Sequence, residues 1–416
     1  MNTNRRQFIK NVTGTNNKAF SLNANINSIE NYENNDNILV IIQLIGGNDS
    51  LNTIIPLDMY DHLMKHRSNI MIEEKRTLKI NDFNAFHPKL EKIYELSKNG
   101  QFCCIQNVGY PNQNRSHFRS MDIWNTASDS NVMLSSGWIG RYLDIFHPKY
   151  PVGYPNKKFP TPLVMTVGDL VADTCQGINT NFSYVMNHLN SIELLEEYSV
   201  NELAKDQKMK AQLLFYNDVI KLTNGYSEVI KQAQQKGKNS VDYPDDNILA
   251  QQLKLVAKLI SGGLGTKIYT LTLGGFDTHL SQTTEETTEG IHATLLKTLS
   301  EAVYAFQMDL NKLGLSERIL TMTYTEFGRQ IASNASRGTD HGCAGSMYFF
   351  SNHFKNSIIG KNPIIEDELE KQAALDMEYD FRDVFATILN KWFKADNDNI
   401  DHIFSRKSTI INDNFI

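Results

Sequence analysis

The chain has 416 residues, of which 41% are hydrophobic, so it is long enough to bury a large core in one or two domains. Its formal net charge of −6 excludes the basic surface on which nucleic-acid-binding proteins depend. No apolar run reaches the roughly 18 residues of a transmembrane helix, so no transmembrane segment is expected. The four cysteines have neither the spacing of a zinc-binding CxxC motif nor that of a disulfide framework.

The N-terminal residues 4–10 read Asn-Arg-Arg-Gln-Phe-Ile-Lys, which resembles a twin-arginine export signal. Such a signal needs an apolar segment after the arginines, but residues 11–18 are polar. We predict that residues 1–36 are a disordered or vestigial leader. We also predict a periplasmic or exported protein, with a cytoplasmic location as the alternative.

Five runs rich in Val, Ile, Leu and Thr follow along the chain, with little of the alternation typical of half-exposed strands. Strands that are covered on both faces have this composition. The runs therefore predict an α/β fold, in which helices flank both faces of a mostly parallel central sheet. They are Ile38–Ile45, Phe102–Val108, Leu163–Val167, Lys267–Leu273 and Arg318–Thr325.

Amphipathic spacing predicts a helix from Pro88 to Asn99 and another that begins at Asp380. Residues 185–261 are rich in Leu, Lys, Gln and Glu, which predicts a helical insertion or cap between strands. We therefore expect one α/β domain over residues 37–400, followed by a C-terminal tail at 401–416.

Acidic and histidine side chains follow three of the five predicted strands, and two more come shortly after the last one. Because the carboxyl ends of parallel strands meet at one edge of a sheet, we expect these side chains to lie close together. Carboxylates and imidazoles that converge in this way are the usual ligands of a divalent metal. The predicted ligands are Asp49, Asp277, His279, Glu326, Asp340 and His341.

Each predicted ligand also has a simpler interpretation. Asp49 could form an Asx-turn or cap a helix, and Asp277 could cap a helix while His279 lies on the surface. Asp340 could bind the metal directly or orient an imidazole. Arg329 could bind an anionic substrate or pair with Glu326.

A candidate nucleophile, Ser116, follows the second predicted strand and precedes a helical pattern. A hydroxyl in this place could be an ordinary helix N-cap. The same place, with a positive helix dipole and a metal nearby, would favour a serine alkoxide. Its neighbours Arg115 and His117 would then bind ester oxygens and act as general acid or base.

Several motifs, taken in order, resemble a bacterial family catalogued as domain of unknown function 1501, over roughly residues 37 to 395. The family is usually placed in the alkaline phosphatase and sulfatase superfamily. The motifs, beyond the paired arginines, are Gly46-Gly-Asn-Asp-Ser-Leu-Asn52, His87-Pro88, Asn114-Arg-Ser-His-Phe118, Gly137-Trp-Ile-Gly-Arg141, Gly274-Gly-Phe-Asp-Thr-His279, Thr325-Glu-Phe-Gly-Arg329 and Gly338-Thr-Asp-His-Gly342.

This resemblance implies an alkaline-phosphatase-like fold with two metals at the C-terminal edge of the sheet. It implies that Asp49 binds one metal, that Ser116 bridges both, and that Asp277, His279 and His341 serve the other. The sequence departs from the pattern at Glu326-Phe327, where the superfamily has Asp-His. Because Phe327 cannot bind a metal, His117 or Asp340 could replace it, or that site is weak and holds an oxygen-loving ion.

These observations predict a metal-dependent hydrolase of phosphate or related esters with one or two divalent ions, Zn, Mg or Ca. The partner would be a small-molecule anionic ester, attacked by a serine. One alternative is a non-catalytic binding or structural protein on the same scaffold, with a degraded metal site. The other is a sulfatase-like hydrolase, although Ser116-His-Phe-Arg does not match the CxPxR-type motif of sulfatases.

Overall fold

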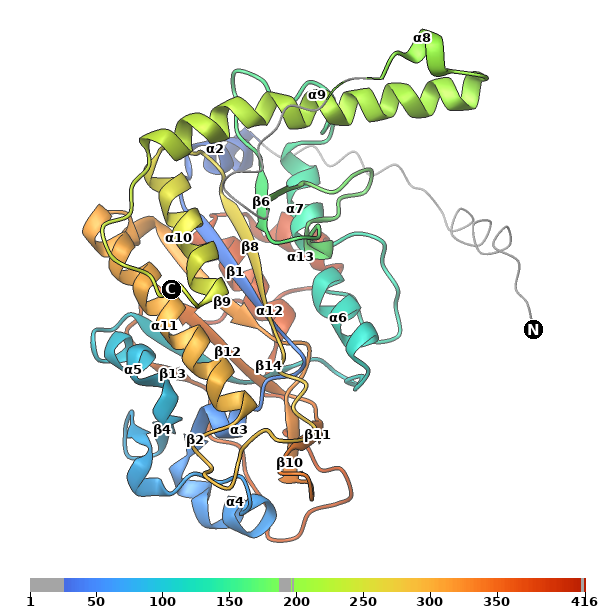
Figure 1. The fold of residues 1–416 in the computed structure, drawn as a ribbon. Helices are drawn as coiled ribbons and strands as arrows, with labels where there is room; N and C mark the ends of the chain where they lie inside the picture. The colour runs from blue at the N-terminus through green and yellow to red at the C-terminus, as the bar shows by residue number, and fades with distance from the viewer. Residues whose placement is uncertain (1–25, 187–195, 197, 413–414) are drawn as a thin grey trace, which may run out of the picture.

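The computed structural model describes residues 26–186, 196, 198–412 and 415–416. A large twisted sheet runs through the centre of the molecule, with helices on both faces (Figure 1). Strand β1 lies in the middle, between β9 and β8, and pairs in parallel with both. The strand order is β13 (Ile358–Ile359), β5 (Phe102–Gly109), β12 (Gly345–Phe350), β9 (Ile319–Tyr324), β1 (Ile38–Ile45), β8 (Ile268–Gly274), β6 (Val164–Val167) and β7 (Ser183–Met186), with β14 (Tyr379–Asp380) beside β5.

One strand of this path runs against the others. β12 is antiparallel to both β9 and β5, so β9 and β5 point in the same direction. The carboxyl ends of β1, β5, β8 and β9 therefore meet at one edge of the sheet, and the amino end of β12 meets them there. This edge is where ligands bind in open α/β sheets.

Side chains of β1 alternate between two hydrophobic cores, because successive residues of a strand face opposite sides. Leu39 and Ile41 pack toward α6 (His117–Thr126), α7 (Trp138–Phe146), α12 (Phe381–Thr387) and α13 (Asn397–Phe404). Val40, Ile42 and Leu44 pack toward α5 (Glu91–Lys98), α10 (Ile248–Ser261) and α11 (Ile291–Leu313). The α/β fold with a mostly parallel sheet is thus confirmed, and all five predicted strands are present.

Smaller elements surround the edge where the strands end. After β1 the chain forms α3 (Ser50–Thr53), β2 (Ile54–Pro56), η1 (Leu57–Met59) and α4 (Tyr60–Arg67). A small three-stranded sheet has the order β2, β4 (Asn84–Phe86) and β3 (Leu78–Lys79). The turn η2 (Glu74–Arg76) precedes β3 in the chain, and η3 (Pro88–Leu90) follows β4. The remaining pieces are a hairpin of β10 (Arg329–Ser333) and β11 (Thr339–His341), the short turns η4 (Asp173–Cys175) and η5 (Ser316–Arg318), and the π-helix η6 (Ile388–Trp392).

The predicted ends of the domain need correction. Residues 26–34 form helix α2 (Ile26–Asn34), and its Tyr32 is buried against Phe146 and His147, so the predicted leader does not extend to residue 36. The twin-arginine segment itself lies outside the described residues. At the other end, α13 continues past residue 400, and Ile411 and Phe415 are buried in the core. Both terminal segments supply apolar area that covers the sheet.

The predicted insertion at 185–261 is mainly helical where it is described. It contains α8 (Val200–Leu203), the long α9 (Gln207–Lys236) and α10. However, α10 is part of the helical layer that covers the sheet, and α9 lies at the end of the sheet opposite to α3, β10 and β11 (Figure 1). The described helices therefore do not cover the candidate site. None of the described helices is long and apolar enough to cross a membrane.

Candidate metal centre

Four segments bring acidic and imidazole side chains together at the carboxyl edge of the sheet. His117 begins α6 after β5, Asp277 and His279 follow β8, and Glu326 follows β9. His341 ends β11, just before the antiparallel β12. If β12 were parallel to its neighbours, its first residue would lie at the opposite edge of the sheet. Because β12 is antiparallel, the preceding residue His341 reaches this site.

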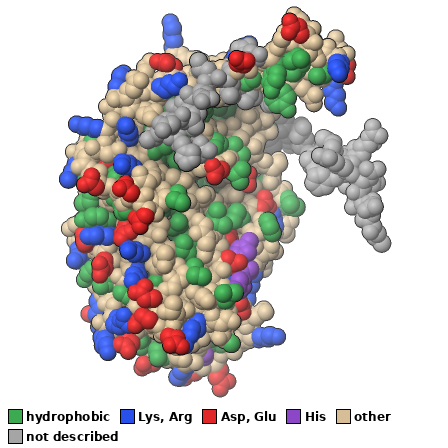
Figure 2. Space-filling model, viewed as in Figure 1, with side chains coloured by type: hydrophobic (Ala, Val, Ile, Leu, Met, Phe, Trp, Pro, Cys, Tyr) green, Lys and Arg blue, Asp and Glu red, His purple; other side chains and the backbone are tan. Residues whose placement is uncertain are grey.

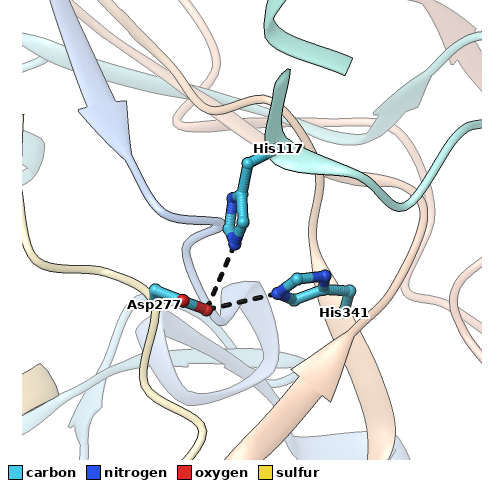
Figure 3. A group of neighbouring side chains, drawn as sticks. All are labelled: His117, Asp277 and His341. Atoms are coloured by element: carbon cyan, nitrogen blue, oxygen red, sulfur yellow. Dashed lines mark hydrogen bonds and ion pairs between the residues drawn. The ribbon is translucent and has the colours of Figure 1, made fainter. Parts of the chain in front are cut away.

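Three imidazoles surround one carboxylate oxygen. Oδ1 of Asp277 lies 3.3 Å from Nε2 of His117 and 3.2 Å from Nε2 of His341, as Figure 3 shows. Nε2 of His279 lies 3.1 Å from the same oxygen and 2.8 Å from Nε2 of His341. His117, Asp277 and His341 can offer ligand atoms that all lie within 4.8 Å of one another. His279 adjoins this triad.

The other nitrogen of each imidazole is held by a partner behind the site. Nδ1 of His117 lies 2.7 Å from Glu326 Oε1, and Nδ1 of His279 lies 2.7 Å from Asp340 Oδ1. Nδ1 of His341 lies 2.7 Å from the backbone carbonyl of Arg115. Metal-binding histidines almost always donate their second N–H in this way, which fixes the ring and leaves Nε2 as the ligand atom.

This geometry fits a metal ion. Nε2 of His117 is buried and has no hydrogen-bond partner among the described residues, so a cation would satisfy it. Ligand atoms ~2.0–2.1 Å from zinc in a tetrahedron lie ~3.4 Å from one another, close to the 3.1–3.3 Å measured from Asp277 Oδ1. Imidazole nitrogens with one carboxylate favour zinc over magnesium or calcium.

Glycines let the first strand approach the site. Gly46 has a φ of +122°, and a Cβ atom there would lie 2.3 Å from the backbone nitrogen of Asp277. The Gly46 N–H donates to Glu326 Oε1 at 2.9 Å. A side chain at position 46 would push the Asp277 segment away, so this glycine is needed for close approach.

Arg329 fixes the position and charge of Asp277. Its Nη2 donates to Asp277 Oδ1 at 2.7 Å, and its remaining bonds go to backbone carbonyls of Gly46, Gly47, Phe276 and Thr339. Partial burial favours a raised pKa for Asp277, but bonding to Arg329 and His341 lowers its pKa to about 2. The Arg329 side chain is fully buried, and its hydrogen bonds hold together the loops around Asp277. Its ion pair is with Asp277 instead of Glu326.

The imidazoles differ in their electrostatics. The hydrogen bond from His117 to Glu326 raises the pKa of His117. Burial is the main reason that the pKa of His341 is lowered, which favours the neutral form that binds metals. The bond to His279 lowers the pKa of Asp340. Asp340 and Glu326 each contact the Nδ1 atom of an imidazole. This geometry favours a role in orienting the rings over direct binding of a metal.

Asp49 is placed in a different environment. Both of its oxygens are bonded to the buried guanidinium of Arg67, and Gln282 Nε2 donates to Oδ2 at 2.6 Å. Burial favours a raised pKa for Asp49, but the charge of Arg67 lowers it. Arg67 thus pairs with the carboxylate that the resemblance implied as a metal ligand. Nothing in the sequence singled out Arg67, since a basic residue in the last turn of a helix is common.

Ser116 occupies the N-cap position of α6, but its side chain makes no capping hydrogen bond and is exposed. The ordinary N-cap interpretation is therefore not supported by the geometry. Arg115, next to it, is partly exposed and donates one hydrogen bond, to the backbone carbonyl of Gln372. Ser116 directly precedes His117 in the chain.

Phe327 forms an apolar wall of the site. It is buried, with its ring centroid 4.9 Å from that of His117 and 4.8 Å from that of His341. Its ring offers no ligand atom, and the imidazole that it contacts on that side is that of His117, from α6. An apolar neighbour strengthens the electrostatic interactions of the ligands by keeping water away.

The protein is thus an α/β protein with a candidate metal centre, lined by His and Asp side chains, at the carboxyl edge of its sheet. The chain belongs to the family described as "Protein of unknown function (DUF1501)", whose profile matches residues 37–404. The resemblance seen in the motifs is thereby confirmed. No curated protein sequence matches the chain.

Several solved structures share features of the fold. A protein in the alkaline phosphatase superfamily from Vibrio parahaemolyticus is 10% identical, with 87% of this chain and 67% of that chain covered and a TM-score of 0.39. The periplasmic domain of EcEptC from Escherichia coli, in complex with zinc, is 7% identical (76% and 73% covered, TM-score 0.34). The PsFucS1 sulfatase from Pseudoalteromonas sp. is 9% identical (93% and 73%, 0.38). These TM-scores are too low to assign an activity to this chain.

Proposed function

We propose that the protein is a zinc-dependent hydrolase of phosphate or related esters, with a single metal bound by Asp277, His117 and His341 and adjoined by His279. The observation that carries this proposal is the convergence of three Nε2 atoms on one carboxylate oxygen, while each Nδ1 is held from behind. Side chains of the site are partly exposed, so a substrate can reach it (Figure 2). Catalytic zinc sites keep such an open position.

A bound zinc ion would polarise the ester and lower the pKa of a nearby hydroxyl or water. In the proposed reaction, Ser116 Oγ gives its proton to water, attacks phosphorus and displaces the alcohol, which takes a proton from water. A second water then cleaves the phosphoserine, which releases phosphate and restores the hydroxyl. The positive end of α6 stabilises the charge that develops beside Ser116, and Arg115 binds a non-bridging oxygen. Glu326 holds Nδ1 of His117 and the metal would take Nε2, so His117 would serve as a ligand and not as general acid or base.

Replacing Ser116 with alanine tests the nucleophile. We expect Ser116→Ala to keep its metal and to lose at least about 10²-fold in kcat on an aryl phosphate, because the covalent route is closed. Ser130→Ala is the matched control, since Ser130 is partly exposed and follows the end of α6. Metal content and kcat are measured together on all three proteins. Equal kcat in Ser116→Ala and wild type would rule out the serine route.

A second candidate function is a metal-binding protein without turnover. The Asp49–Arg67 pair favours it, because a carboxylate already neutralised by arginine is not free for a second ion. A single bound metal with no hydrolysis of any phosphate or sulfate ester would support this candidate. Turnover that a chelator abolishes would exclude it.

A further inference from the structure

A single buried glutamine, Gln282, joins two of the chain segments that supply the metal centre. Its Oε1 lies 3.0 Å from Oγ1 of Thr278 and 2.6 Å from Oγ1 of Thr339. Thr278 directly follows Asp277, and Thr339 begins β11, which ends at His341. All three of the bonded side chains are buried. Gln282 therefore holds both ligand-bearing segments through one atom.

The charge of Asp49 fixes which way the amide of Gln282 points. The Asp49 carboxylate is paired with Arg67, so it is ionised and can only accept hydrogen bonds. The amide atom that lies 2.6 Å from Asp49 Oδ2 must therefore be the donor Nε2, which leaves Oε1 of Gln282 toward the two threonines. Both threonine hydroxyls must then donate to Oε1. No member of this buried chain of bonds can turn without leaving a polar group unpaired.

Other contacts hold the same two segments. Arg329 Nη1 donates to the backbone carbonyl of Thr339 at 2.8 Å, and the partly exposed Asn334 donates through Nδ2 to the carbonyl of His279 at 2.7 Å. The backbones also meet directly, since the Thr339 N–H donates to the Thr278 carbonyl at 3.1 Å. Loss of the glutamine amide would therefore loosen the segments without releasing them.

We propose that Gln282 is a positioning residue of the metal centre. Through its two threonine partners it sets the 3.2 Å separation between Asp277 Oδ1 and His341 Nε2 (Figure 3), and it touches neither metal nor substrate itself. The inference rests on the metal centre of the proposed function. It also gives Asp49 a role, because the charge of Asp49 anchors the amide that orders the ligands. Metal and catalytic sites require their groups to be held within about 0.5 Å of the working geometry.

Zinc affinity, measured by competition with a chromophoric chelator, tests the inference without any turnover. Gln282→Met keeps an unbranched side chain of similar length and removes all three amide hydrogen bonds. Thr339→Val is the milder variant, since it removes one hydroxyl, and Thr339→Ser retains that hydroxyl. Thr283→Val is the matched control, because Thr283 is buried in the same segment and its Oγ1 has no hydrogen-bond partner among the described residues.

We expect Gln282→Met to bind zinc at least about tenfold more weakly than the wild type, as is usual when a group that orients metal ligands is lost. The affinity of Thr339→Val should fall between these two. Thr339→Ser and Thr283→Val should bind zinc as tightly as the wild type. If Gln282→Met does not fold, the comparison of Thr339→Val with Thr339→Ser decides the question.

A second control separates positioning from a general loss of stability. Tyr243→Phe removes a buried hydrogen bond of 2.9 Å to Asp309, which lies ~27 Å along α11 from the first residue of that helix. This variant should unfold at lower urea concentration and keep its zinc affinity. Zinc affinity unchanged in Gln282→Met, no recovery in Thr339→Ser, or the same weakening in Tyr243→Phe would overturn the inference.

The same experiment separates this inference from the hydrolase proposal. If the wild type binds zinc and the variants weaken in the expected order, but the zinc-loaded protein cleaves no ester, the hydrolase proposal fails while the role of Gln282 stands. If zinc binds equally to all variants and esters are cleaved, the role of Gln282 fails alone. A wild type that binds no zinc overturns both.

Discussion

Replacing His341 with alanine is expected to remove the metal and to lower turnover by at least about 10³-fold, because several kcal/mol of transition-state stabilisation depend on the ion. His341 approaches both Asp277 and His279 through Nε2, so its loss removes a ligand from the centre of the cluster. The measurement is zinc content by elemental analysis, with kcat on an aryl phosphate from the same sample.

Two variants make this result specific. His353→Ala removes a partly exposed imidazole that lies 2.7 Å from the Glu317 carbonyl, away from the site, and should keep both metal and activity. Asp340→Asn removes only the charge behind His279, so metal affinity should fall by about 10–100-fold without being abolished. Full zinc content in His341→Ala would contradict the assignment of this residue as a ligand.

Arg67→Met is expected to destabilise the fold by about 3–5 kcal/mol, because it leaves the buried carboxylate of Asp49 without its cation. The matched control is Arg76→Met, since Arg76 pairs with Glu286 at the surface and should cost less than about 1 kcal/mol. Free energies of unfolding from urea titration measure both. The double variant Arg67→Met/Asp49→Asn should recover part of the loss, because the buried charge is gone.

The same pair predicts a pH dependence. Arg67 lowers the pKa of Asp49 in the folded protein, so the carboxylate stabilises the fold above its unfolded pKa of about 3.9. This stabilisation is lost as the pH falls through the lower folded value. In Arg67→Met burial raises the pKa instead, and protonation relieves the variant first. The difference in unfolding free energy should therefore shrink on acidification, and a difference that grows would contradict the pairing.

The sequence predicted the sheet and its ligand-bearing edge well, because strands buried on both faces have an unmistakable composition. Runs such as Ile38–Ile45 and Phe102–Val108 lie within the observed strands. Terminal segments were harder to predict. Tyr32 and Phe415 belong to short, polar-looking stretches, and their burial depends on distant partners such as Phe146 and Phe349. Pattern reasoning over neighbours in sequence does not reach such contacts.

The residues of the site were easier to predict than their roles. Asp277, His279 and His341 do converge, and His117 joins them from α6. Whether a carboxylate meets a metal or stands behind an imidazole depends on a few ångströms of side-chain placement, as with Glu326. Asp49 carries the same motif signal as a ligand, yet a single residue from another helix, Arg67, provides its positive partner.

Elemental analysis of the wild-type protein, purified without chelator, tests the central claim most directly. One metal centre with Asp49 held by Arg67 predicts about one zinc per chain. It also predicts that Asp277→Ala/His279→Ala loses this zinc. Two ions per chain would mean that Asp49 binds a metal after all, and no zinc in the wild type would mean that the histidines around Asp277 form only a hydrogen-bonded cluster.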